Sequence, residues 1–452
     1  MILYLLTIVS EHENGAIEVN GRFWRLCPYD LDEFTPESLE FICISYSWGL
    51  GREPSPFHHD FLVSDRTVPA LVTVARLRPA CKHIWVDAFC VPPEEPERCH
   101  TLESMGYIYS KAHEVIAVLS DVVLPSLISM QKDKQLAEQH MFELEKDEWV
   151  TRAWTYQEAV NARCLFITCE DSGDVIISGQ DFINYLGCAL AHLSIRPLER
   201  RALYPRLDAL EDLVDYLTAE YQERSALQVM AKMDRRFHGR PEDHFYAMIG
   251  AISSSLSSST GAVDACEAFM RICERKGDFS FIYSVAPRAL EAGRRWRPVP
   301  GDLPAVLQWD SWGSGEPGRI THDGLLLENV VQLDLGDVST EADHFIRNWL
   351  TLIRQVPEGA SPAEVSVHVF DALRLMGFTG PSHSLATPAG LFFPVRLVSP
   401  DEVYSVFISS SIRWVFGSPG ILCCQSTDQV SYVPGVLVGT VKHCSTIPVT
   451  MS

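Results

Sequence analysis

The sequence lacks the short motifs that mark several common nucleotide and hydrolase sites. It has no P-loop, no G-x-S-x-G nucleophile elbow and no H-E-x-x-H zinc motif. Its 13 cysteines form no C-x-x-C pair. Several of them, such as Cys43 and Cys90, lie in apolar runs, where a free thiol packs as a small core residue. We therefore predict no metal site and no disulfide framework.

Long apolar segments and an excess of positive charge are also missing. The N-terminal run Ile2–Val9 has no basic flank and is too short to cross a bilayer, so it is better interpreted as a strand. The formal net charge of −22 disfavours nucleic acid and anionic membranes as partners. We expect a cytoplasmic protein with reduced cysteines, no membrane span and no nucleic-acid partner.

What the sequence does contain is typical of a globular chain with several domains. It has 452 residues, of which 46% are hydrophobic and 21% charged, enough for two or three domains. Apolar runs typical of buried strands alternate with helical patterns, and this order predicts a parallel sheet covered by helices. The predicted strands are 41–49, 84–91, 114–119 and 164–169, and the predicted helices between them are 68–77, 101–112 and 149–160.

Changes of pattern along the chain predict four parts. A strand-rich lead-in over 1–40 precedes an α/β domain over 41–178. Helical periodicity dominates an extension over 179–300, and short apolar runs with glycine and proline predict a β-rich domain over 301–452. The predicted fold class is α/β: a parallel sheet with helices on both faces, then a helical region and a β-rich C-terminal region.

Two predicted strands end in groups that suit a ligand. The strand over 41–49 opens into small polar residues and glycine, and ligands of open α/β sheets bind at such carboxyl ends. In the strand over 84–91, Asp87 places a carboxylate in an apolar run, which costs free energy unless the carboxylate is paired. Binding to backbone N–H groups or to an arginine explains Asp87 as well as ligand binding does.

The segment Trp149–Val160 predicts an amphipathic helix. Its apolar stripe is formed by residues at helical spacing, namely Trp149, Ala153, Tyr156 and Val160. Trp154 and Glu158 lie one turn apart on another face, so the carboxylate stands beside the indole, where desolvation raises a pKa. From spacing alone the simpler interpretation is favoured: the stripe explains the helix and Glu158 is a solvated residue.

Together these segments resemble the fungal heterokaryon-incompatibility (HET) domain family. The matching blocks follow the family's order over residues 41–312: Ile44–Gly49, Ile84–Cys90 with Glu97 and Arg98, Met105–Tyr109, Arg152–Glu158, Pro241–Gly250 and Leu303–Trp312. The chain departs from the family at Val91–Pro93, where Ile-Asn-Gln is usual, and at Thr101, where glutamine is usual. If those polar groups hold a ligand, its binding is weakened or altered here.

The HET family is similar in outline to Toll/interleukin-1 receptor (TIR) domains, which are flavodoxin-like α/β folds. Some TIR domains cleave the nicotinamide–ribose bond of NAD with a helix glutamate four residues after a tryptophan, and Trp154 and Glu158 reproduce that spacing. The resemblance therefore implies a pocket for NAD or a related nucleotide, with Glu158 as the catalytic residue and NAD as substrate rather than cofactor. It assigns ligand binding to the matching blocks: Ser45, Tyr46, Ser47, Trp48, Gly49, Asp87, Arg152, Trp154 and Gln157.

The resemblance leaves three functions open. The first is a fungal self/non-self recognition or programmed cell-death protein whose α/β domain is an NAD glycohydrolase. Glu158 would then hydrogen-bond a ribose hydroxyl and stabilise the developing oxocarbenium ion. The second is a non-catalytic module that acts by self-association or by assembly with protein partners, with Glu158 in a structural role. The third is recruitment of the fold to another small-molecule reaction.

Overall fold

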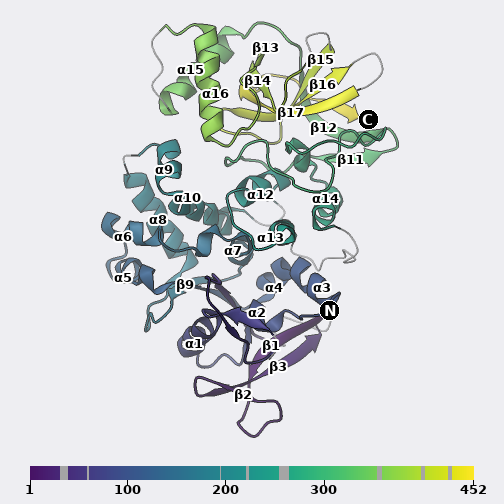
Figure 1. The fold of residues 1–452 in the computed structure, drawn as a ribbon. Helices are drawn as coiled ribbons and strands as arrows, with labels where there is room; N and C mark the ends of the chain where they lie inside the picture. Colours follow the sequence, from purple (N-terminus) through teal and green to yellow (C-terminus); the bar gives the residue numbers. More distant parts are fainter. Residues whose placement is uncertain are drawn as a thin grey trace. The chain divides into compact units, whose positions relative to one another are not determined.

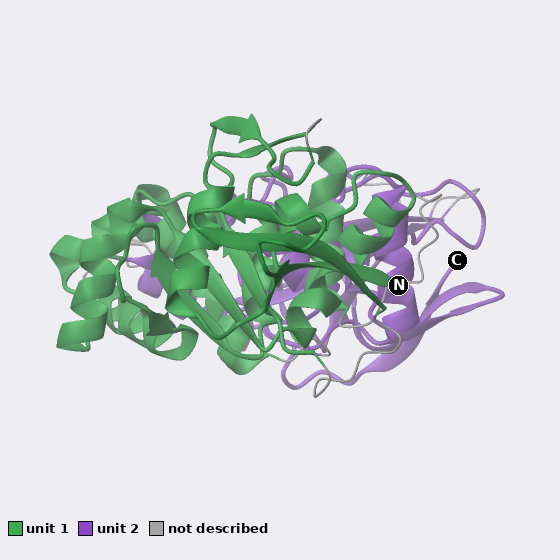
Figure 2. Ribbon diagram, turned by 90° about the horizontal axis from the view of Figure 1, so that it is seen from below, with its two compact units in different colours: residues 1–195, 200–221, 236–263 green, residues 196–199, 222–235, 264–452 purple. Residues whose placement is uncertain are grey.

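The structure is a computed structural model of the chain. It describes residues 1–30, 39–58, 61–193, 195–219, 223–253, 264–353, 359–398, 403–425 and 430–452 (Figure 1). Contacts divide the chain into two compact units (Figure 2). Unit 1 comprises residues 1–195, 200–221 and 236–263, and unit 2 comprises residues 196–199, 222–235 and 264–452. The four-part division expected from the sequence stays a prediction.

An eight-stranded sheet forms the centre of unit 1, in the order β10-β9-β8-β4-β7-β1-β3-β2. The bounds are β1 Ile2–Ile8, β2 Ile17–Val19, β3 Arg22–Asp30, β4 Ile42–Tyr46, β7 His83–Trp85, β8 Glu114–Leu119, β9 Leu165–Cys169 and β10 Ile177–Ser178. The central pairs β9–β8, β8–β4 and β4–β7 are parallel. The lead-in strands β1, β3 and β2 extend the sheet by antiparallel pairing (Figure 1). The expectation of an α/β fold with parallel strands is confirmed.

The helices of unit 1 connect these strands, and α1 and α7 both contact the fully buried strands β4 and β8. The helix bounds are α1 Thr67–Leu77, α2 Asp87–Cys90, α3 Glu97–Glu103, α4 Met105–Lys111, α5 Leu124–Asp133, α6 Glu138–Leu144, α7 Ala153–Val160, α8 Gly179–His192, α10 Pro205–Leu210, α11 Asp215–Thr218 and α13 Pro241–Ile252. A short hairpin pairs β5 Arg52–Pro54 with β6 Leu62–Ser64. The helices from α8 onward, with α9 Pro197–Leu203 and α12 Ala226–Met233, form the expected helical middle region.

The predicted strand over 84–91 is wrong in its second half. Pairing between β7 and β4 covers only Ile84 and Trp85, and a short helix begins at Asp87. The Asp87 side chain accepts a hydrogen bond from the backbone N–H of Ala88, at 2.7 Å from Oδ1. A carboxylate in a first helical turn satisfies N–H groups that have no partner within the helix. An apolar run alone does not distinguish a buried strand from a short buried helix.

The predicted helix over 149–160 also begins later than expected. Residues Trp149–Thr151 form a 3-10 turn, Arg152 is extended with ψ 140°, and α7 starts at Ala153. The break is explained by a non-local contact. The carbonyl of Phe237 accepts from the Ala153 N–H at 2.9 Å, and the Phe237 N–H donates to Thr151 at 2.6 Å. Backbone pairing with a distant segment therefore replaces the first helical turn.

Unit 2 contains a second eight-stranded sheet, in the order β11-β12-β15-β16-β17-β14-β13, with β18 paired to β12. Every pairing in it is antiparallel. The strands are β11 Gly318–Thr321, β12 Gly324–Leu333, β13 Leu385–Thr387, β14 Gly390–Pro394, β15 Val403–Ser409, β16 Gly417–Gln425, β17 Val430–Gly439 and β18 Ile447–Met451. Besides α12, its helices are α14 Ala265–Lys276, α15 Thr340–Ile353 and α16 Pro362–Leu375. The expected β-rich C-terminal region is confirmed.

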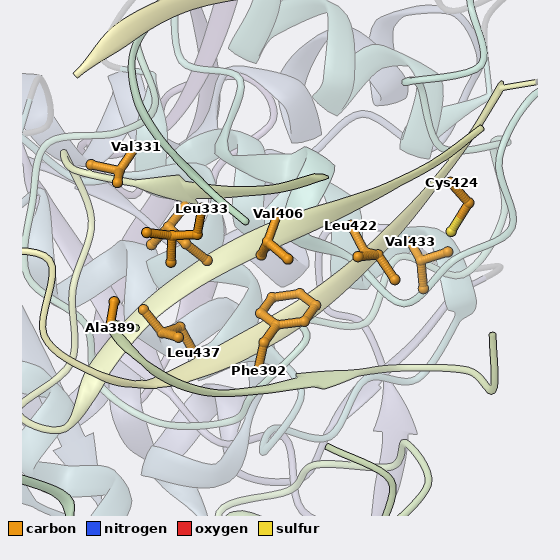
Figure 3. Packing of buried hydrophobic residues seen from close by; sticks show 10 residues of the cluster. Val331, Leu333, Ala389, Phe392, Val406, Leu422, Cys424, Val433 and Leu437 are labelled. Atoms are coloured by element: carbon orange, nitrogen blue, oxygen red, sulfur yellow. The ribbon is translucent and has the colours of Figure 1, made fainter. Parts of the chain in front are cut away.

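The core of this second sheet follows the two-residue period of its strands (Figure 3). Alternate residues on neighbouring strands point to one face, because side chains of a strand alternate between the faces of the sheet. The buried cluster consists of Val331, Leu333, Ala389, Phe392, Val406, Ile408, Leu422, Cys424, Val433 and Leu437. Gly420 and Gly435 face each other across β16 and β17. A Cβ at Gly435 would lie 2.5 Å from Cζ of Phe392, so the glycine makes room for the ring.

Candidate functional site

The end of β4 brings Ser45 and Glu158 together. Ser45, which is 1% exposed, donates its hydroxyl hydrogen to Oε2 of Glu158 at 2.5 Å. The same hydroxyl oxygen accepts a hydrogen bond from Nε1 of Trp149 at 2.8 Å. Ser45 therefore links the central strand to α7 and to the 3-10 turn that precedes it. Sequence spacing placed Trp149 only in an apolar stripe, so its polar role at this site was missed.

Glu158 is a buried carboxylic acid, and the interpretation of it as a solvated residue is wrong. Its exposed fraction is 4%. Burial raises the pKa of Glu158 to about 8, with a further increase from the nearby negative charge of Asp87. The hydrogen bond from Ser45 and the positive charge of Arg152 act in the opposite direction on this pKa. At neutral pH the carboxyl group is therefore mainly protonated.

Asp87 lies beside this pair and orients an aromatic ring. Its Oδ2 accepts a hydrogen bond from Nε1 of Trp48 at 2.9 Å, while Oδ1 binds the Ala88 N–H. Burial raises the pKa of Asp87, and the hydrogen bond from Trp48 opposes that increase. Tyr46 reaches the same region, where its hydroxyl lies 2.9 Å from Oγ1 of Thr67. The interpretation of Asp87 as a partner of backbone N–H groups is confirmed, and Trp48 is an additional partner.

An arginine that sequence reasoning missed completes the end of β4. Nη1 of Arg66 donates to the hydroxyl of Ser47, and its Nε donates to Oε1 of Glu170 at 2.6 Å. Gly49 has a left-handed φ of +58°, and a Cβ there would lie 3.2 Å from Cδ of Arg66. A glycine fits this position for both reasons. No local signal in the sequence connects Arg66 to Ser47, because the contact spans a loop and the start of α1.

Arg152 acts on the site through its charge. It lowers the pKa of Glu158 and of Asp87 by coulombic attraction, although burial dominates both shifts upward. Within the described part of the chain its side chain makes no hydrogen bond or ion pair that would neutralise it. The structure therefore places a positive side chain near the two carboxyl groups.

The two remaining predicted residues face α13. The rings of Trp154 and Tyr246 are nearly parallel, with centroids 6.5 Å apart and planes inclined by 16°. Gln157 is fully buried, and neither polar atom of its amide has a hydrogen-bond partner among the described residues. A Cβ at Gly250 would lie 1.3 Å from Oε1 of Gln157. These two side chains thus pack between helices, whereas Glu158 faces β4.

The departure at Thr101 also has a local structural explanation. Its hydroxyl donates to the Glu97 carbonyl one turn earlier in α3, at 2.9 Å, and the side chain is buried. A threonine in a helix commonly bonds its own backbone in this way. Thr101 therefore contributes a satisfied polar group to α3.

Comparison with known families gives one match. Residues 41–138 match the family model described as Heterokaryon incompatibility protein (HET), as the resemblance predicted. The matched segment contains β4, Trp48, Asp87 and the departures at 91–93 and Thr101, and ends before Glu158. No curated protein and no solved structure matches the chain. The match associates this segment with heterokaryon incompatibility.

The residues that the structure describes lack two features. They contain no helix that is both long and apolar enough to cross a membrane. They also contain no group of three or more histidine, cysteine, aspartate or glutamate side chains arranged to hold a metal ion. The end of β4 presents hydroxyl, carboxyl, indole and guanidinium groups.

Proposed function

We propose that the chain acts in fungal self/non-self recognition or programmed cell death, and that the carboxyl end of β4 binds NAD or a related nucleotide. The observation that carries the proposal is the hydrogen bond between Ser45 and Glu158 at the end of the central parallel strand, near the charge of Asp87. Ser45 and Asp87 both lie within the segment that matches the HET family. Ligands of open α/β sheets bind at this end of the strands.

The proposed chemistry is hydrolysis of the nicotinamide–ribose bond, in which nicotinamide leaves and water adds to the ribose carbon, with Glu158 as the central carboxyl group. An ionised carboxylate stabilises an oxocarbenium-like transition state, whereas a protonated one does not. Because burial raises the pKa of Glu158 to about 8, the carboxyl group is mainly neutral at pH 7. Ionisation is favoured when the contact between β4 and α7 opens and water reaches Glu158. Assembly of several chains is the proposed trigger for that opening.

A second candidate is a non-catalytic assembly module. The 4% exposure of Glu158 favours it, since a neutral acid bonded to Ser45 also serves as a buried link between β4 and α7. In this case the site holds the fold together and protein partners or further copies of the chain carry the signal.

The experiment is nicotinamide release from NAD by the full chain, free and tethered at high density. Glu158→Gln removes the acid and keeps its shape, and Glu18→Gln on the exposed face of β2 is the matched control. We expect release by the wild type and by the control, and a loss of at least about 100-fold in Glu158→Gln. The rate should rise from pH 7 to pH 9 as Glu158 ionises. Equal release by all three proteins would exclude Glu158 as the catalytic group. Absent release by all three, tethered and free, would exclude cleavage and leave the assembly module.

A further inference from the structure

The indole of Trp48 already carries a planar cation on its face. Cζ of Arg52 lies 5.5 Å from the centroid of the Trp48 ring. A cation within about 6 Å of a tryptophan face is attracted by the negative face of the ring. Trp48 is only partly buried, so its face is within reach of a ligand from solvent. The Arg52 guanidinium is therefore an example, within the chain, of the planar cations that the face of Trp48 attracts.

The orientation and charge of the ring also favour a cation. Nε1 of Trp48 donates to Oδ2 of Asp87 at 2.9 Å, and Asp87 is itself held by the Ala88 N–H. This bond fixes the plane of the indole and places a carboxyl group at its edge. A fixed aromatic face beside an acidic group is a site for a positively charged planar ring.

Arg52 is held weakly enough for a ligand to replace it. Its Nη1 donates to the carbonyl oxygens of Gly49 and Gly51, at 3.2 and 2.7 Å. The side chain is exposed and makes no ion pair within the described ranges. Water is able to take over both carbonyl contacts when the guanidinium leaves. An exposed cation–π contact corresponds to only about a 2- to 5-fold preference for the bound position.

We propose that the face of Trp48 binds the pyridinium ring of a nicotinamide-type ligand, and that Arg52 is the internal occupant which this ring displaces. The inference rests on the proposed function, which puts NAD or a related nucleotide at the end of β4. It adds the group that is recognised: the positively charged ring. A neutral ring of the same shape lacks the attraction that the indole face and Asp87 provide.

The test compares two probes that differ in ring charge, 1-methylnicotinamide and nicotinamide, by calorimetric titration of the full chain. We expect the wild type to bind the charged probe at least about 5-fold more tightly than the neutral one. Arg52→Ala removes the internal competitor and should tighten the charged probe by about 2- to 5-fold. Arg76→Ala is the control, since Arg76 is an exposed arginine of α1 without an ion pair among the described residues.

Trp48→Phe provides a second variant, because it keeps an aromatic ring and loses the bond to Asp87. It should reduce the preference for 1-methylnicotinamide over nicotinamide by about 2- to 5-fold. The inference is overturned if the wild type and Arg52→Ala bind both probes equally or bind neither, or if Arg52→Ala behaves like Arg76→Ala. If the wild type prefers the charged probe but releases no nicotinamide from NAD, the proposed cleavage is excluded and the proposed ring site is retained. If nicotinamide release depends on Glu158 but the two probes bind equally, the proposed ring site is excluded and the proposed cleavage is retained.

Discussion

The two sheets of this chain bury different chemistry. At the end of β4 in unit 1, the buried side chains include Ser45 and Glu158. The cluster under the second sheet in unit 2 is apolar throughout, with Phe392 at its centre (Figure 3). Burying a polar group costs free energy unless it is hydrogen-bonded, whereas burying an apolar one stabilises the fold. Unit 1 therefore buries polar groups at the end of β4, whereas the cluster of unit 2 is packed from apolar side chains alone.

Among the buried acids of unit 2, Glu316 sharpens the comparison. Burial raises the pKa of Glu316 to about 7, and the nearby charge of Asp278 adds to the increase. Oε2 of Glu316 accepts a hydrogen bond from the hydroxyl of Tyr283 at 2.8 Å. A raised carboxyl pKa is thus no evidence of catalysis by itself. What sets Glu158 apart is its place at the end of a central parallel strand.

The largest expected effect lies in the apolar cluster. Phe392→Ala removes the ring that fills the space over Gly420 and Gly435, so it should lower the free energy of unfolding of unit 2 by about 3–5 kcal/mol. Chemical denaturation measures this loss, and the nicotinamide probes should still bind. A loss of probe binding in a folded Phe392→Ala protein would contradict the separation of packing and site between the two units.

The next effect is the pH dependence of stability caused by Glu158. Its folded-state pKa of about 8 lies above the ordinary value of 4.5. The folded state therefore binds the proton more tightly, and stability is full below pH 4.5 and falls as pH rises towards 8. The slope reaches about 1 kcal/mol per pH unit inside that window.

Glu158→Gln should flatten this part of the profile, as measured by urea denaturation from pH 5 to 8. Glu316→Gln is the variant for comparison, because it removes a buried acid of unit 2 whose pKa is raised to about 7. The stability difference between Glu158→Gln and wild type should grow with pH. A difference that stays constant across the window would show that Glu158 is not a buried neutral acid.

The smallest expected effect concerns the helix crossing beside the site. Three helices meet closely at Gly106 of α4, Gly250 of α13 and Gln157 of α7. A Cβ at position 250 would overlap Gln157, so Gly250→Ala forces neighbouring atoms to move and should lower the free energy of unfolding by about 1–3 kcal/mol. Gly187→Ala in α8, with nothing within 4 Å of its added Cβ, should instead stabilise by about 0.5–1 kcal/mol. Thermal unfolding compares the two. In the double variant Gly250→Ala with Gln157→Ala, part of the loss should be recovered, whereas strictly additive losses would contradict the contact.

The sequence predicted the layout of the chain because hydrophobic period and local turn chemistry act over short distances. Alternating apolar runs and helical patterns predicted the parallel strands β4, β8 and β9, and short apolar runs with glycine and proline predicted the β-rich region of unit 2. The block Ile44–Gly49 and Asp87 were recognised as unusual because polar residues in apolar strands stand out locally. Spacing also predicted that Trp149, Ala153, Tyr156 and Val160 are buried, as they are.

Only the tertiary structure decided which of these groups meet. The hydrogen bond between Ser45 and Glu158 joins residues 113 positions apart, and the one between Arg66 and Glu170 joins residues 104 positions apart. Helical periodicity predicted that Glu158 is solvated, because the pattern describes a single helix and does not reveal which elements pack on the other face of that helix. The start of α7 at Ala153 likewise depends on backbone pairing with Phe237. Burial and electrostatics at the site arise from these long-range contacts, and they raise the pKa of Glu158 to a value that local sequence does not determine.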